Sequence, residues 1–206
     1  MKTPLHYQIT EYDCGPTSVL NAMRFLFERE NIPPEVQKYV TMYCLDAYNS
    51  KGEHGKNGTS KMAMMFLANW LNQFEKTQKF PIFCRYLSGN EASVRANTEV
   101  VGALQQGGAV MVRLMYGVWH YVLLTGLDGE WVEVFDPYYR EKPFRQKSIQ
   151  IVNDSPLSMN RRVRIELFEG TGKTTYALGN PDEREAVLFF NTRTRKTPDK
   201  TIEYFL

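Results

Sequence analysis

One cysteine of this 206-residue chain stands where a nucleophile could form. Cys14 lies in the stretch YDCGPTS, directly before a glycine, a proline and an apolar pattern with helical spacing. A thiol attacks as the thiolate, which is favoured by a helix N-terminus beside the sulfur and by an imidazole that can take its proton. The context therefore makes Cys14 a candidate nucleophile that needs a histidine nearby.

Three histidines could supply that base, namely His6, His54 and His120. His54 lies in a glycine-rich polar loop, and His6 is close to the N-terminus, so neither has an obvious means of fixing its ring. His120 instead opens the β-rich run HYVLLTG, where a strand would hold the side chain. We expect His120 to be the imidazole that holds the proton of the thiol.

The next β-rich run, WVEVFD, ends at Asp136 before a proline. If the two runs pair as a hairpin across Asp128 and Gly129, His120 falls within one position of Asp136 on the facing strand. The carboxylate could then accept the Nδ1 proton of the imidazole and fix its tautomer. Taken alone, an aspartate before a proline also suits an Asx-type turn, and a lone histidine also suits a core position.

Stabilisation of a developing oxyanion requires hydrogen-bond donors as well. Two candidates are the backbone N–H of Cys14 at the helix start and the side-chain amide of Gln8, one loop upstream. Gln8 could equally be a surface residue. All four residues together point to acyl chemistry through a covalent thiol intermediate.

The other two cysteines, Cys44 and Cys84, lie inside apolar elements and are expected to be buried packing residues. Three widely spaced cysteines without a CxxC pair argue against a disulfide framework and a zinc cluster. We expect neither a metal nor a cofactor.

Composition and charge narrow the class of protein. The chain is 43% hydrophobic and 23% charged, with a net charge of only +2, and its basic residues are scattered. An ordinary globular protein is expected, and nucleic-acid binding is not, because that requires a concentrated basic surface. The start MKTPLHYQIT does not resemble a secretory signal, and no apolar stretch is long enough to span a membrane, which predicts a cytoplasmic protein.

Helical spacing dominates the first part of the chain. A helix is expected from Cys14 or just after it, capped by Asp13, and another over EVQKYVTMYCLDAY. A third, KMAMMFLANWLNQF, follows Thr59 and Ser60 as candidate caps, and a short helix over NTEVVGALQQGG precedes the sheet. The expected core face of the third helix consists of Met62, Phe66, Trp70 and Phe74.

Strand patterns dominate the rest of the chain. They are PIFCRYL, AVMVRLM, HYVLLTG, WVEVFD, SIQIVN, RRVRIELFEG and AVLFFNTR. Helices followed by an antiparallel sheet predict an α+β fold. We expect one domain over residues 1–206, with a catalytic core at 1–140 and a strand-rich extension at 141–206. The stretch GTGKTT is interpreted as a hairpin turn, because Leu167 stands where a phosphate-binding loop requires glycine.

The stretch QITEYDCGPTS resembles the signature of the bacteriocin-processing, double-glycine leader peptidases and their standalone relatives, which are papain-like cysteine peptidases. NGTS, LQQGGAVMVRL, HYVLLTG and VEVFDP follow in the order of that family, over roughly residues 5 to 140. The resemblance implies Cys14 as nucleophile and His120 as base and acid. It also implies Asp136 as the partner that orients His120, with Gln8 in the oxyanion hole.

The expected reaction is hydrolysis of a bond in a peptide or protein substrate through an acyl-enzyme. The best-known members are fused to a membrane-spanning transporter, and this sequence contains no such segment, so cleavage after a Gly-Gly leader is not carried over. Two alternatives remain open. An acyltransferase or transglutaminase-like enzyme would use the same site with another acceptor, and a catalytically inactive module would only bind peptides.

Overall fold

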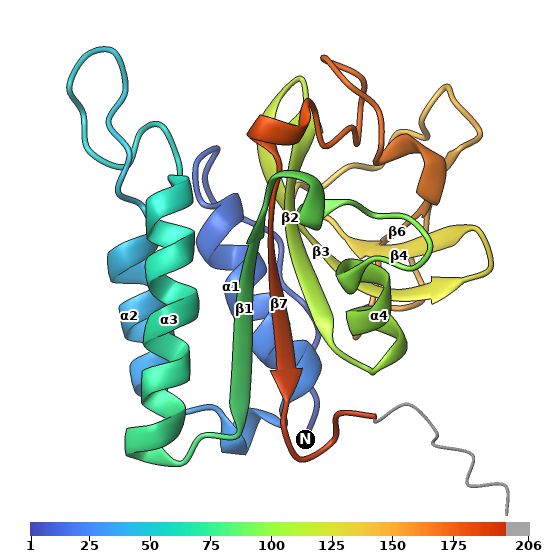
Figure 1. Ribbon diagram of the computed structural model, residues 1–206. Helices are drawn as coiled ribbons and strands as arrows, with labels where there is room; N and C mark the ends of the chain where they lie inside the picture. Colours follow the sequence, from blue (N-terminus) through green and yellow to red (C-terminus); the bar gives the residue numbers. More distant parts are fainter. Residues whose placement is uncertain (197–206) are drawn as a thin grey trace, which may run out of the picture.

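The computed structural model describes residues 1–196. It consists of one antiparallel sheet with helices packed on both of its faces (Figure 1). Helices α1 (Cys14–Leu26), α2 (Pro34–Cys44) and α3 (Lys61–Gln78) cover one face, and α4 (Glu99–Gln105) lies on the other. The predicted α+β class is confirmed.

The seven-stranded sheet is formed by residues 82–191, and its last strand along the chain, β7, lies beside its first, β1. Its strands are β1 (Ile82–Ser88), β2 (Ala109–Tyr116), β3 (Val118–Asp128), β4 (Trp131–Phe135), β5 (Ile149–Ile151), β6 (Arg161–Arg164) and β7 (Glu185–Asn191). They lie in the order β1-β7-β2-β3-β4-β6-β5, and all neighbours are antiparallel. Because β7 lies between β1 and β2, the chain after residue 140 supplies an interior strand of the sheet. The expected domain also included residues 197–206, which lie outside the described residues.

Each face of the sheet has its own apolar core. Alternate side chains of a strand point to opposite faces, so Tyr121 and Leu123 of β3 pack towards α1, while Val122 and Leu124 pack towards α4. Both cores are closed to solvent. The strand β3 is therefore buried on both sides and can hold a side chain at its end in a fixed place.

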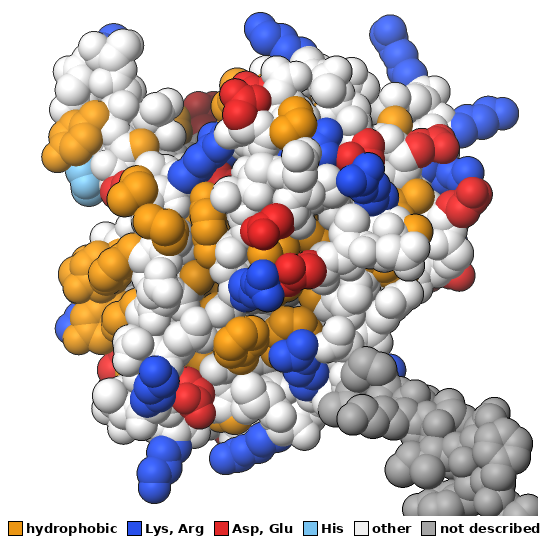
Figure 2. Space-filling view, viewed as in Figure 1, with side chains coloured by type: hydrophobic (Ala, Val, Ile, Leu, Met, Phe, Trp, Pro, Cys, Tyr) orange, Lys and Arg blue, Asp and Glu red, His pale blue; other side chains and the backbone are white. Residues whose placement is uncertain are grey.

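The predicted core face of α3 is wrong for two of its four residues. Met62 is 67% exposed and Phe66 is 47% exposed, whereas Phe74 is buried and Trp70 is half-buried. The buried stripe instead consists of Ala63, Met64, Leu67, Ala68, Leu71 and Phe74. The helix is apolar on much of its circumference, so spacing alone could not choose the face, and the small alanines allow closer packing. Figure 2 shows the apolar side chains that remain exposed over α2 and α3.

Of the predicted helix caps, Ser60 is confirmed and Asp13 is not. Ser60 caps α3, because its Oγ accepts the N–H of Ala63 at 3.1 Å. Asp13 does not cap α1 with its side chain, which instead accepts the N–H groups of Ile9 and Thr10 at 3.1 and 2.9 Å. Asp13 therefore folds the loop that precedes the helix.

Three expected boundaries or connections also differ. Helix α2 ends at Cys44, before the last residues of EVQKYVTMYCLDAY, and RRVRIELFEG forms a strand only at its start. The stretch GTGKTT lies in a loop between two short 3-10 turns and does not join a pair of strands, so the predicted hairpin there is wrong. No helix of residues 1–196 is both long and apolar enough to cross a membrane.

Candidate active site

Cys14 is the first residue of α1 and is 8% exposed. The turn it begins is packed tightly against the loop before α3. A Cβ atom added at Gly15 would lie 2.3 Å from Oγ1 of Thr59 and 2.9 Å from the terminal methyl carbon of Met64. Only glycine allows this approach, so the NGTS segment and the cysteine-bearing turn are placed together by the fold.

His120 lies near the start of β3 and is 6% exposed. Its Nε2 atom is 2.8 Å from Oδ1 of Asp136, a residue that is completely buried. The expected contact of the carboxylate with Nδ1 is therefore wrong, because Nε2 is the ring nitrogen that faces it. With Nε2 facing Asp136, the Nδ1 atom is the nitrogen left for the thiol.

Burial and charge oppose each other at this pair. Burial lowers the pKa of His120, but the Asp136 carboxylate and a hydrogen bond with the Cys14 thiol raise it, from 6.5 to about 10 overall. Burial raises the pKa of Asp136, but His120 and the hydrogen bonds it accepts lower it overall. An imidazolium beside a carboxylate is thus the favoured state, with the thiol as a further neighbour of the ring.

The register that brings the pair together differs from the expected one. The hairpin pairs Asp128 with Trp131, so its turn is Gly129 and Glu130. The register then shifts at a β-bulge between Leu124 and Gly126.

This shift decides which face Asp136 occupies. After the bulge, Leu123 pairs with Phe135, so Asp136 continues towards the place opposite Val122. Val122 and His120 point to the same face, because they are two residues apart on one strand. Without the shift, Asp136 would continue opposite Leu123 and point to the other face of the sheet.

Asn160 and Tyr176, which are not among the residues predicted from the sequence, also hold Asp136. Oδ2 of Asp136 accepts the hydroxyl of Tyr176 at 2.6 Å. The side chain of Asn160 accepts the backbone N–H of Asp136 and donates to its carbonyl, both at 2.8 Å. Both residues lie in polar stretches with no periodic pattern, so no sequence signal marks them.

The Asx-type turn considered for Asp136 is present as well. The backbone N–H of Tyr138 donates to Oδ1 of Asp136 at 2.8 Å. The same carboxylate oxygen therefore closes the turn and faces the imidazole. The turn and the histidine contact are compatible, because a carboxylate oxygen has two lone pairs.

Gln8 lies beside this turn. Its backbone N–H donates to the carbonyl of Pro137 at 2.9 Å, and its Nε2 donates to the carbonyl of Thr10 at 2.7 Å. Its Oε1 is buried without a hydrogen-bond partner among residues 1–196. The structure ties Gln8 to the Asp136 loop, and its oxyanion role stays a prediction.

The remaining histidines and cysteines do not join this group. The ring of His54 packs on Tyr48, with centroids 5.0 Å apart. Cys44 and Cys84 are free and buried, as expected, and burial raises the pKa of each thiol well above its ordinary value. Within residues 1–196, no cluster of three or more histidine, cysteine or acidic side chains could hold a metal ion.

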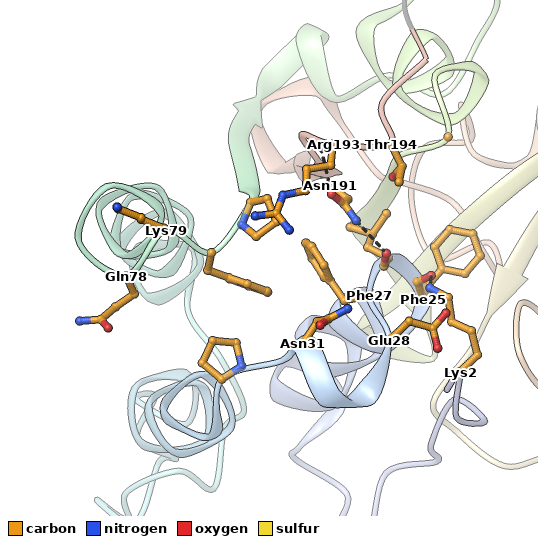
Figure 3. Close-up of a pocket in the computed structure, with 15 residues that line it drawn as sticks. Lys2, Phe25, Phe27, Glu28, Asn31, Gln78, Lys79, Asn191, Arg193 and Thr194 are labelled. Carbon is orange, nitrogen blue, oxygen red and sulfur yellow. Dashed lines mark hydrogen bonds between the residues drawn. The ribbon is translucent and has the colours of Figure 1, made fainter.

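A cavity of about 650 Å³ lies at the other end of α1 (Figure 3). Phe27, Asn31, Lys79 and Arg193 are among the residues that line it. Since α1 rises about 1.5 Å per residue over its 13 residues, the cavity is about 20 Å from Cys14. It is separate from the group around His120.

A helix that begins at a cysteine and packs on an antiparallel sheet bearing a histidine–aspartate pair is the arrangement of papain-like cysteine peptidases. The chain belongs to the Peptidase_C39 like family, whose model matches residues 1–155. The resemblance stated from the sequence is thereby confirmed. No curated protein matches the chain.

Several solved structures are similar over most of their length. The peptidase domain of Streptococcus ComA, a bifunctional ABC transporter of a quorum-sensing pathway, is 14% identical with a TM-score of 0.49, over 91% of this chain and 97% of that one. A double-glycine motif protease from an AMS/PCAT transporter, in complex with its leader peptide, is 12% identical with a TM-score of 0.45, over 91% and 89%. A C39-like peptidase from Bacillus anthracis is 15% identical with a TM-score of 0.48, over 90% and 93%. The family assignment is based on the match to residues 1–155.

Proposed function

We propose that the protein hydrolyses peptide bonds, with Cys14 as nucleophile, His120 as base and acid, and Asp136 as the group that orients His120. One observation carries the proposal, the 2.8 Å contact between Nε2 of His120 and Oδ1 of Asp136 beside the first residue of α1. Membership of a cysteine peptidase family supports the same assignment.

In the first half of the reaction, His120 already holds the proton of the Cys14 thiol on Nδ1, and the sulfur bonds as a thiolate to the substrate carbonyl carbon. The oxyanion of the tetrahedral intermediate is stabilised by the backbone N–H of Cys14 and by the free N–H of the Gln8 amide. The C–N bond then breaks, and His120 gives its proton to the departing amine. A thioester between Cys14 and the acyl part of the substrate remains.

In the second half, water attacks the thioester while His120 accepts one proton of the water. The C–S bond breaks, the carboxylic acid leaves, and the sulfur is released as a thiolate beside the protonated His120. An amine in place of water would give the acyltransferase or transglutaminase-like alternative, without any change in the residues. Because the same residues serve both reactions, analysis of the products is needed to tell whether water or an amine is the acceptor.

The substrate class follows from this chemistry as a peptide or protein. The three free cysteines support a reducing compartment and the cytoplasmic location expected from the sequence. Recognition of a Gly-Gly motif is one specificity to be tested among others.

The first experiment measures the rate of iodoacetamide alkylation at each cysteine against pH, in the wild type, His120→Ala and His54→Ala. Fast labelling of Cys14 well below pH ~8.5 is expected in the wild type and in His54→Ala, and its loss in His120→Ala. Cys44 and Cys84 are internal controls and should stay unlabelled until the protein is denatured, because both are buried.

The second experiment incubates the protein with a peptide library, with and without an added amine. Hydrolysed products that vanish in Cys14→Ala support the peptidase. Detection of amine adducts would instead show that the enzyme is an acyltransferase. If Cys14 labels no faster than an ordinary thiol and peptides are bound but not cut, the peptidase and the acyltransferase are both contradicted. The inactive peptide-binding module would then be the remaining alternative.

A further inference from the structure

Asp136 needs more partners than the family signature supplies. A buried ionised carboxylate is costly unless each oxygen is hydrogen-bonded or paired. Oδ1 faces His120 and the N–H of Tyr138, which both lie within the family-matched residues 1–155. Oδ2 has one hydrogen-bond partner among the described residues, the hydroxyl of Tyr176.

Tyr176 is held in one place by its own surroundings. It is completely buried and has a φ of 67°, in the left-handed region that bulky residues rarely adopt. Its N–H donates to the carbonyl of Met115 at 2.8 Å, and the N–H of Met115 donates to Ala177 at the same distance. Its ring packs on Tyr116 and Phe144, with centroids 5.9 and 6.1 Å apart. The loop is thus fastened to the end of β2 with the hydroxyl directed at Asp136.

Asn160 holds the backbone of the same residue. Its amide bonds to both the N–H and the carbonyl of Asp136, and its own N–H donates to Val134 at 3.0 Å. The guanidinium of Arg161 then donates to the carbonyls of Asn160 and Tyr138, at 2.8 and 3.3 Å. Asn160 therefore fixes the backbone position of Asp136, and Tyr176 fixes the orientation of its carboxylate.

We propose that Tyr176 and Asn160 are positioning residues for the Asp136–His120 pair, so that the chain beyond residue 155 completes the active site. The inference rests on the proposed function for its catalytic meaning. It also gives the stretch 141–196 a role in the same domain. Without the Tyr176 hydroxyl, Oδ2 would be buried and unpaired, and the carboxylate could turn away from the imidazole.

The charged and titratable groups near the pair come from several elements. They are His120 on β3, Arg161 on β6, Tyr116 on β2 and Tyr176 in its loop, together with the Cys14 thiol on α1. Replacing the tyrosine hydroxyl alone leaves the other groups in place. A change in the titration of His120 would then report the orientation of the carboxylate.

The test compares Tyr176→Phe with Tyr86→Phe. Tyr86 also donates its hydroxyl to a buried carboxylate, that of Glu185 at 3.1 Å, but it packs on the opposite face of the sheet. The imidazole of His120 is titrated by NMR in both variants, and kcat and KM are measured with a peptide found in the library screen. Asn160→Ala is a second variant with the same readouts.

We expect Tyr176→Phe and Asn160→Ala to lower the pKa of His120 and to reduce kcat by about 10- to 100-fold with little change in KM. Tyr86→Phe should leave all three near the wild type. If Tyr176→Phe only lowers the melting temperature while the His120 titration and kcat stay unchanged, the residue is structural and the proposal is wrong. A wild type that hydrolyses nothing would overturn the proposed function, and the NMR titration would still decide the positioning role.

Discussion

Nε2 of His120 lies 2.8 Å from Oδ1 of Asp136, although the two residues are not paired across the β3–β4 hairpin. The contact is diagonal, which a β-sheet permits when both side chains share a face. The β-bulge between Leu124 and Gly126 puts them on the same face. A local irregularity of the sheet thus determines the geometry of the candidate site.

Replacement of the Asp136 carboxylate by a neutral amide should change how the free energy of unfolding depends on pH. The pKa of His120 is raised from 6.5 to about 10, so its contribution to folding is complete below 6.5 and is lost as the pH rises towards about 10. The pKa of Asp136 is lowered from 3.8, so its contribution is present above 3.8 and is lost at more acidic pH. We expect Asp136→Asn to reduce the free energy of unfolding by about 3 kcal/mol between pH 3.8 and 6.5, where both groups are charged.

Urea unfolding of the wild type and Asp136→Asn across this pH range checks the expectation. The difference between the two proteins should be largest between pH 3.8 and 6.5 and should shrink above it. A difference that grows from neutral to alkaline pH would show that the pair is not charged as described.

The close approach at Gly15 predicts a position-specific effect of a single methyl group. Gly15→Ala should destabilise the protein by about 1–3 kcal/mol, because the added Cβ overlaps Thr59 and Met64. It should also slow alkylation of Cys14. Gly102→Ala in α4 is the matched control, since its Cβ would meet only the end of the Gln106 side chain at 3.8 Å. That control should be neutral or stabilising by about 0.5–1 kcal/mol, as measured by denaturant unfolding.

The predicted oxyanion role of Gln8 can be separated from its structural contacts. Gln8→Ala removes the side-chain amide and keeps the backbone bond to Pro137. If the amide stabilises the oxyanion, kcat should fall about 100-fold with little change in KM. Steady-state kinetics on a peptide substrate measures this effect. An unchanged kcat would leave the backbone N–H of Cys14 as the remaining candidate donor.

The place of β7 in the sheet predicts the outcome of a truncation. A fragment of residues 1–155 would contain the family-matched sequence but would lack β6 and β7, so β1 would lose its neighbour and β2 one of its two. We expect this fragment to lack a cooperative thermal transition in circular dichroism, whereas residues 1–196 should fold. A fragment of 1–155 that unfolds cooperatively would refute the central role of β7.

Local patterns in the sequence predicted much of this protein. The start of α1 at Cys14, the strand that begins near His120 and the burial of Cys44 and Cys84 follow from helical and strand periodicity, which depends on neighbouring residues. The α+β class follows from the order of those patterns. The family signature around Cys14 identified the kind of protein.

Tertiary structure decided what the patterns left open. The face of α3, the bulge in β3 and the nitrogen of His120 that meets Asp136 each depend on how elements pack. Asn160 and Tyr176 reach Asp136 from 24 and 40 residues away. Periodicity records which side of an element is apolar, but a hydrogen bond between distant segments depends on the packing of the whole sheet, so no local pattern could have predicted it.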